Sequence, residues 1–203
     1  MDEPARIGIY GGSFDPIHYG HLAIAEEART TLALTSVAFV PAAHQPLKGQ
    51  SQSAPEHRLA MVRLACADHP AFIPDDLELR RPPPSYTINT IESYHDRYGT
   101  NAELWFIIGA DAARDLPRWH RVADLVSLVR LVIVGRPGYS VDLPALAATI
   151  PALVGRCVLI NGPRLDVSSS ELRRRLAADC PVRYQMPEPV RLYIAEHDLY
   201  TKQ

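Results

Sequence analysis

Lysine is almost absent from this chain of 203 residues, in which only Lys48 and Lys202 accompany nineteen arginines. The formal net charge of −2 at pH 7 leaves no broad basic field. A nucleic-acid backbone or an anionic membrane is therefore not an expected partner, because both are bound mainly through clustered positive charge. Any anionic ligand has to be bound by a local site.

Cysteine is also scarce, and its spacing excludes two kinds of site. Cys66, Cys157 and Cys180 form an odd, widely separated set that fits neither a disulfide framework nor a CxxC metal site. No apolar run approaches the ~18 residues of a membrane span, and acidic residues stand near the start of the chain, where a signal peptide carries positive ones. We therefore expect reduced thiols in a cytoplasmic protein.

Short apolar runs alternate with amphipathic stretches along the chain. Five runs rich in β-branched residues predict buried strands, which begin at Arg6, Ser36, Glu103, Arg130 and Arg156. Helices are predicted over residues 20–34, 55–69, 86–98, 112–128, 143–150, 169–178 and 187–197. This alternation favours an α/β fold, in which a parallel sheet is covered by helices on both faces. We expect a single domain over residues 1–203, with the helices at about 169–200 packed on it.

The segment GGSFDPIHYGH follows the first predicted strand and leads into the first predicted helix. Gly11 and Gly12 allow a sharp turn and a close approach of a ligand to the backbone. His18 and His21 stand three residues apart around the helix start, so both rings can point toward one ligand. Backbone N–H groups and the positive end of the helix dipole favour phosphate there. The segment therefore predicts a phosphate site.

Other interpretations of this segment are a plain tight turn and a pair of metal-binding or structural histidines. It is neither a Walker loop nor a GxGxxG dinucleotide fingerprint. It resembles the signature of the HxGH-type nucleotidyltransferase superfamily, whose defining positions match His18, Gly20 and His21. The resemblance implies a Rossmann-like, doubly wound fold and catalytic contacts from His18 and His21 to the ATP phosphates. It also implies that four residues of the turn bind ATP: Gly11, Gly12, Ser13 and Phe14.

A second segment, DVSSSELRR, opens a predicted helix near the end of the chain. Taken alone, the serine run is an ordinary helix cap, and Ser168 with Glu171 fits a capping box. The segment also resembles the superfamily's ISSTxIR signature, which implies that Ser169 and Ser170 bind ATP and that Arg173 is catalytic. Hydroxyls and amides at a helix N-terminus would then form a second anion site that faces the first. Two further arginines match no motif position and are expected to be solvated, Arg174 and Arg175.

Segments outside the two signatures bear on the acceptor. The loop PAAHQPLK and the helix after it resemble the family's PPHK-type region without its double proline, which implies that Lys48 and Arg58 bind the acceptor. The segments PSYT, FIIGAD, LPRWH and RPG resemble those of bacterial nicotinate mononucleotide adenylyltransferases. This resemblance assigns acceptor contacts to Tyr86, Thr87 and Trp119, and ATP contacts to Gly109, Asp111 and Arg136. Trp119 would stack on the pyridine ring, and an ordinary core or lid aromatic is the alternative interpretation.

The resemblance spans almost the whole chain and implies transfer of AMP from ATP to nicotinate mononucleotide, giving nicotinic acid adenine dinucleotide and pyrophosphate. Mg²⁺ would arrive bound to ATP, because no carboxylate cluster suggests a metal cage made by the protein. The rival interpretations are phosphopantetheine adenylyltransferase, a cytidylyltransferase, an aminoacyl-tRNA synthetase and a module that binds ATP without turnover. The synthetase would need a KMSK-type loop and tRNA-binding parts that the sequence lacks. Formation of a homo-oligomer stays open.

Overall fold

The computed structural model describes residues 4–47, 51–99, 102–135 and 140–201. Its strands are β1 (Ala5–Gly12), β2 (Ser36–Pro41), β3 (Phe72–Pro74), β4 (Ala102–Gly109), β5 (Arg130–Val134) and β6 (Cys157–Ile160). Its α-helices are α1 (Tyr19–Thr31), α2 (Pro55–Cys66), α3 (Thr87–Tyr98), α4 (Ala110–Ala113), α5 (Val122–Leu128), α6 (Leu143–Thr149), α7 (Ser169–Ala177) and α8 (Glu188–Glu196). Two 3₁₀ helices are η2 (Leu116–Arg118) and η3 (Pro151–Leu153). Across these ranges, no helix combines the length and the apolar character that a membrane crossing needs.

The strands form one parallel sheet in the order β3-β2-β1-β4-β5-β6. The chain winds outward from β1 through β2 to β3, then returns and places β4 on the other side of β1. In sheets wound in this way, the ligand crevice lies at the carboxyl ends of the strands where the order reverses. Tyr10 stands opposite Ile107, so β1 and β4 end close together. The predicted doubly wound α/β fold is confirmed.

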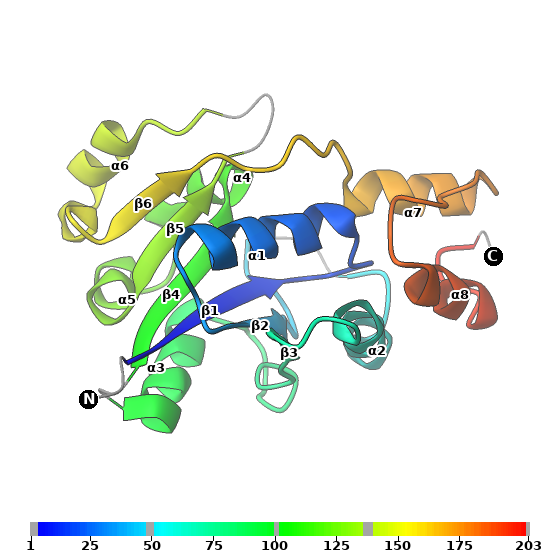
Figure 1. Cartoon of the computed structure of the whole chain (residues 1–203), viewed down its shortest axis with the longest axis horizontal. Coiled ribbons are helices and arrows are strands. Elements are labelled where there is room, and N and C mark those ends of the chain that lie inside the picture. The colour runs from blue at the N-terminus through cyan, green and yellow to red at the C-terminus, as the bar shows by residue number, and fades with distance from the viewer. Residues whose placement is uncertain (1–3, 48–50, 100–101, 136–139, 202–203) are drawn as a thin grey trace.

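Both faces of the sheet are buried, because successive side chains of each central strand enter different cores. In β4, Trp105 and Ile107 join a core shared with α1, α2, α7 and α8. Leu104 and Phe106 join a second core, shared with α3 and α5. Figure 1 shows α7 and α8 beside each other at the end of the molecule toward which β1 points. The last two helices therefore lie at the edge of the sheet where a ligand is expected.

Two stretches differ from the sequence expectation. The sequence does not predict β3, because a strand of three residues gives no periodic signal. The prediction of a single helix over residues 112–128 is wrong, since the chain forms α4, η2 and α5 there. Pro117 has no amide hydrogen with which to continue an α-helix, and Arg121 takes a left-handed conformation with φ of 52°. The break leaves Trp119 in an extended conformation at the end of η2.

The three cysteines are free and differ in exposure. Burial raises the pKa of the Cys66 thiol to about 12 and that of Cys157 to about 11. Because the thiolate is the form that is alkylated, iodoacetamide at about pH 8 should label exposed Cys180 first and spare Cys66 until the protein unfolds. Mass spectrometry of peptides over a time course checks this order. Early labelling of Cys66 in the folded protein would contradict it.

Candidate active site

A cleft of about 690 Å³ lies where β1 and β4 end and where α1 and α7 begin. Its lining includes most of the predicted site residues: Gly11, Gly12, Ser13, Phe14, His18, His21, Tyr86, Thr87, Gly109, Asp111, Trp119, Ser169, Ser170 and Arg173. Lys48 and Arg136, also predicted to bind substrate, lie outside the described residues. The two segments that resemble superfamily signatures therefore meet at one cleft, although they stand at opposite ends of the chain.

The two histidines form a stacked pair at the start of α1. Their ring centroids lie 3.8 Å apart at an interplanar angle of 24°. The backbone N–H of His18 donates to Nδ1 of His21 at 3.3 Å. Neutral His21 therefore carries its proton on Nε2 and can donate a hydrogen bond from there. A Cβ at Gly20 would lie 3.0 Å from the His18 ring, so glycine at this position leaves room for the pair.

Phe14 lies beneath the cleft, because the residue is 0% exposed. Its ring packs edge-on against His21, with centroids 5.2 Å apart, and against Tyr10, with centroids 5.6 Å apart. The Phe14 side chain therefore supports His21 from below. The contact between Phe14 and ATP that the resemblance implies stays a prediction, because the whole residue is buried here.

Side chains from α7 hold the backbone of the first motif, which is the segment GGSFDPIHYGH at residues 11–21. Ser169 Oγ donates to the carbonyl of Pro16 at 2.9 Å. Arg173 Nη1 donates to the carbonyl of Asp15 at 2.7 Å. Arg173 also lines the cleft, where a guanidinium suits phosphate oxygens. This arginine therefore connects the two motifs and adds positive charge to the site.

Arg58 does not reach the cleft, and its predicted contact with the acceptor is corrected by the structure. The residue is 1% exposed on α2. Its Nη1 donates to the carbonyl of Ser13 at 2.8 Å, and its Nε donates to the carbonyl of Ser53 at 3.3 Å. Burial lowers the pKa of Arg58, and the negative charge of Asp15 opposes that shift. The side chain is enclosed between α2 and the first motif, so Arg58 holds the motif in place.

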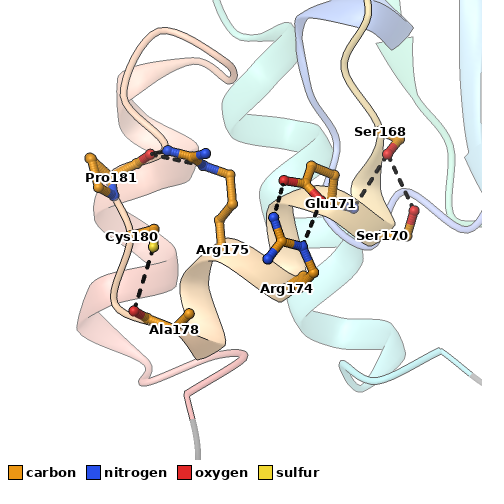
Figure 2. Close-up of polar contacts among 8 residues, drawn as sticks. All are labelled: Ser168, Ser170, Glu171, Arg174, Arg175, Ala178, Cys180 and Pro181. Atoms are coloured by element: carbon orange, nitrogen blue, oxygen red, sulfur yellow. Dashed lines mark hydrogen bonds and ion pairs between the residues drawn. The ribbon is translucent and has the colours of Figure 1, made fainter.

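Ser168 caps α7, but the predicted capping box forms only in part. Ser168 Oγ accepts a hydrogen bond from the backbone N–H of Glu171 at 3.3 Å. The Glu171 carboxylate accepts two hydrogen bonds from Arg174, at 2.6 and 2.8 Å, as Figure 2 shows. An ion pair on the helix surface thus takes up the carboxylate that would have completed the box. Arg174 is exposed, as predicted, while Arg175 donates to the carbonyl of Pro181 at 2.8 Å (Figure 2).

Aromatic side chains line another part of the cleft. Trp119 is half-buried and packs edge-on against Phe106, with ring centroids 5.9 Å apart. Tyr86 lies against His120, with ring centroids 4.3 Å apart. Tyr86 is also the N-cap of α3, and Thr87 is the first residue of that helix. Aromatic faces beside a helix N-terminus suit a flat ring that carries a negative group.

Asp111 lies just beyond the end of β4, in the first turn of α4. A Cβ at Gly109 would lie 2.6 Å from Oδ1 of Asp111, so glycine allows the carboxylate to approach the end of the strand. A carboxylate in this place can accept a hydrogen bond from a ribose hydroxyl. The expected role of Asp111 on the ATP side of the site stays a prediction.

Sequence reasoning misses Glu78, a buried acid in the cleft lining. It is 8% exposed, and its Oε1 accepts a hydrogen bond from the Thr90 hydroxyl at 2.6 Å. Burial raises the pKa of this carboxyl, although hydrogen bonds from Thr90 and Ser85 act in the other direction. Ser85 Oγ accepts a hydrogen bond from the N–H of Ala43 at 3.0 Å, which connects the loop after β2 to the start of α3. Glu78 stands in a turn with no motif, so no local signal marks it.

A doubly wound parallel sheet with a glycine turn, two histidines and an arginine around one cleft is typical of a protein that binds nucleotide phosphates. Residues 9–175 match the family described as Cytidylyltransferase-like. A relative from Roseiflexus sp. strain RS-1, named probable nicotinate-nucleotide adenylyltransferase, is 55% identical over 97% of this chain and 98% of its own length. One from Herpetosiphon aurantiacus, with the same name, is 51% identical over 96% and 98%. The chain belongs to the nicotinate-nucleotide adenylyltransferases of the cytidylyltransferase-like family.

Solved structures share the fold. Plasmodium falciparum nicotinic acid mononucleotide adenylyltransferase complexed with NaAD matches with a TM-score of 0.80 and 23% identity, covering 97% of each chain. A putative nicotinate-nucleotide adenylyltransferase from Vibrio parahaemolyticus matches with a TM-score of 0.68 and 17% identity, covering 98% of this chain. At these identities the likeness concerns the fold alone, and it confirms the Rossmann-like architecture.

Proposed function

We propose that this chain transfers the AMP part of ATP to nicotinate mononucleotide, producing nicotinic acid adenine dinucleotide and pyrophosphate. The observation that carries the proposal is one cleft, lined by His18, His21 and Arg173 and also by Tyr86 and Trp119. The first group offers hydrogen-bond donors and positive charge to phosphates, and the second offers aromatic faces to a pyridine ring. Relatives with 51% and 55% identity that carry this enzyme's name support the choice of acceptor.

In this reaction a phosphate oxygen of the acceptor attacks the α-phosphorus of ATP in line. The bond from that phosphorus to the bridging oxygen breaks, and pyrophosphate leaves with the electron pair. The second pKa of a phosphate monoester is about 6, so the attacking oxygen is already ionised and needs no general base. Catalysis then depends on positioning and on stabilising developing charge. His21 donates from Nε2 to a phosphate oxygen, and Arg173 balances negative charge beside it.

Mg²⁺ is the cofactor that we infer for this reaction. Within the described ranges, no group of three or more His, Cys, Asp or Glu side chains is placed to hold a metal ion. The donor set of the cleft instead suits phosphates, so Mg²⁺ would be held by the phosphates of ATP and by water. When bound, it neutralises charge on the phosphate oxygens. His18, His21 and Arg173 would orient the phosphates that carry it.

Release of pyrophosphate, measured with ATP, Mg²⁺ and nicotinate mononucleotide, tests the proposal directly. Phosphopantetheine in place of the mononucleotide, and CTP in place of ATP, test the two rival transferases. Binding of ATP without release of pyrophosphate with any acceptor would identify a nucleotide-sensing module and overturn the proposal.

The acid should be strongly preferred over the amide as acceptor. Nicotinate and nicotinamide mononucleotides differ only where a carboxylate replaces a carboxamide, and the backbone N–H groups at the start of α3, near Thr87, would favour the negative oxygen. A charge-assisted hydrogen bond contributes about 1.5–3 kcal/mol, so its loss gives roughly tenfold to hundredfold discrimination. The ratio of kcat/KM for the two mononucleotides under identical conditions checks this. Equal values would remove the acid-specific assignment and leave the adenylyl transfer intact.

We also infer that the chain works in the cytoplasm as a single domain. Its cysteines are free, as expected for a reducing compartment. Leu172 of α7 and Val190 of α8 belong to the same core as Ala25 of α1, so the last helices share their packing with the sheet. Light scattering coupled to gel filtration would establish whether the domain is a monomer or a homo-oligomer.

A further inference from the structure

Tyr200 lies beyond the last helix, yet its side chain returns to the first motif. Its hydroxyl donates to Oδ1 of Asp15 at 2.7 Å, across 185 positions of the sequence. Burial raises the pKa of Tyr200, so the phenol stays protonated and remains a donor at the pH of ordinary assays. The far end of the chain therefore supplies a hydrogen bond beneath the cleft.

The carboxylate that receives this hydrogen bond joins three segments of the chain. Asp15 is 2% exposed. Its Oδ2 accepts from the N–H of Gln52 at 2.7 Å, and its Oδ1 accepts from the N–H of Ser53 at 3.3 Å. The carboxylate and its partners come from three parts of the chain: Asp15 from the first motif, Gln52 and Ser53 from the segment before α2, and Tyr200 from beyond α8. A buried carboxylate with several donors is held firmly, because leaving any of them unpaired is costly.

Asp15 also stands close to the catalytic histidines. It precedes His18 by three residues, and its own carbonyl accepts the hydrogen bond from Arg173 at 2.7 Å. A shift of Asp15 would therefore move both the start of α1 and the guanidinium that faces the cleft. Reactions that rely on positioning are sensitive to shifts of this kind, since a displacement of ~1 Å can cost ~10² in rate.

We propose that Tyr200 is a positioning residue for AMP transfer, which acts through Asp15 to hold the His18 segment and the segment before α2 in their working arrangement. The inference rests on the proposed function. It adds a residue near the end of the chain, outside the cleft lining and outside both motifs, to the groups on which the reaction rate depends.

Tyr200→Phe tests this, because phenylalanine keeps the ring and removes the donor. Tyr193→Phe is the matched control, since Tyr193 is also partly buried, lies on α8 and bonds His57 at 2.9 Å, away from the first motif. Tyr200→Phe should lower kcat about tenfold and change the KM for ATP less. Tyr193→Phe should keep the kcat of the original chain. Both rates are taken per folded molecule, as measured by circular dichroism, so a loss of folded protein does not count as a catalytic effect.

The pair should also be energetically coupled. If Tyr200 acts through Asp15, the double variant Asp15→Asn with Tyr200→Phe should be no slower than Asp15→Asn alone. Additive losses, or an unchanged kcat in Tyr200→Phe, would overturn the inference.

Hydrogen exchange supplies a readout that does not depend on the proposed reaction. In Tyr200→Phe, peptides that contain residues 13–18 and 52–53 should exchange faster, and in Tyr193→Phe they should not. Unchanged exchange would refute the positioning role even if the acceptor proved to be a different molecule. Failure of the original chain to release pyrophosphate would instead count against the proposed function, and the exchange result would still decide the role of Tyr200.

Discussion

His21→Ala is expected to lower kcat by about 10² or more, because it removes a donor aimed at charge that develops in the transition state. The affinity for ATP should fall less, since the turn and the helix start that we expect to bind phosphate remain. Steady-state kinetics with ATP, Mg²⁺ and nicotinate mononucleotide measure both quantities. Loss of the ring also removes its stacking with His18 and its edge contact with Phe14, so circular dichroism must confirm the fold.

A histidine away from the cleft lining provides the control for this experiment. His197 is exposed and caps the end of α8. His197→Ala should leave kcat unchanged. A His21→Ala variant that keeps both its fold and its full kcat would exclude His21 from the chemistry.

Arg58→Ala is expected to reduce the free energy of unfolding by about 3 kcal/mol, because it leaves two buried carbonyls without a charged donor. Those carbonyls belong to Ser13 and Ser53, so the substitution should destabilise the first motif and the segment before α2. The buried carboxylate of Asp15 also loses the positive charge nearby. Urea denaturation followed by circular dichroism measures the change.

Arg63→Ala is the matched control, since Arg63 is exposed on the same helix. It should change stability little, as surface substitutions usually do. If Arg58→Ala kept its stability and raised only the KM of the acceptor, the acceptor contact expected from the sequence would be correct and the structural role would be wrong.

The two motifs could be predicted because their chemistry is local. Gly12, His18 and His21 stand within one short segment, and the strand before it and the helix after it follow from periodicity alone. The doubly wound sheet follows from the alternation of elements. The capping box predicted at Ser168 forms only in part, because Arg174 competes for the Glu171 carboxylate.

The role of Arg58 could not be predicted, because it depends on a partner 45 positions away. The family resemblance assigns Arg58 to the region that binds the acceptor. Whether its side chain faces the cleft or the interior depends on tertiary packing, which the resemblance does not give. Glu78 is a similar case, since its partner Thr90 lies on a helix that packs back over the turn. Contacts of this kind arise from tertiary packing, so the spacing of residue types along the sequence does not indicate them.

The hydrogen bonds that join Ser169 to Pro16 and Arg173 to Asp15 bear on how the protein is synthesised. On the ribosome, the six strands emerge before α7, because β6 ends at Ile160 and α7 begins at Ser169. A nascent chain can therefore assemble its sheet while the first motif still lacks the partners that fix it. We expect the nucleotide site to mature only after α7 leaves the exit tunnel, so chains stalled before that point would form the sheet and remain inactive.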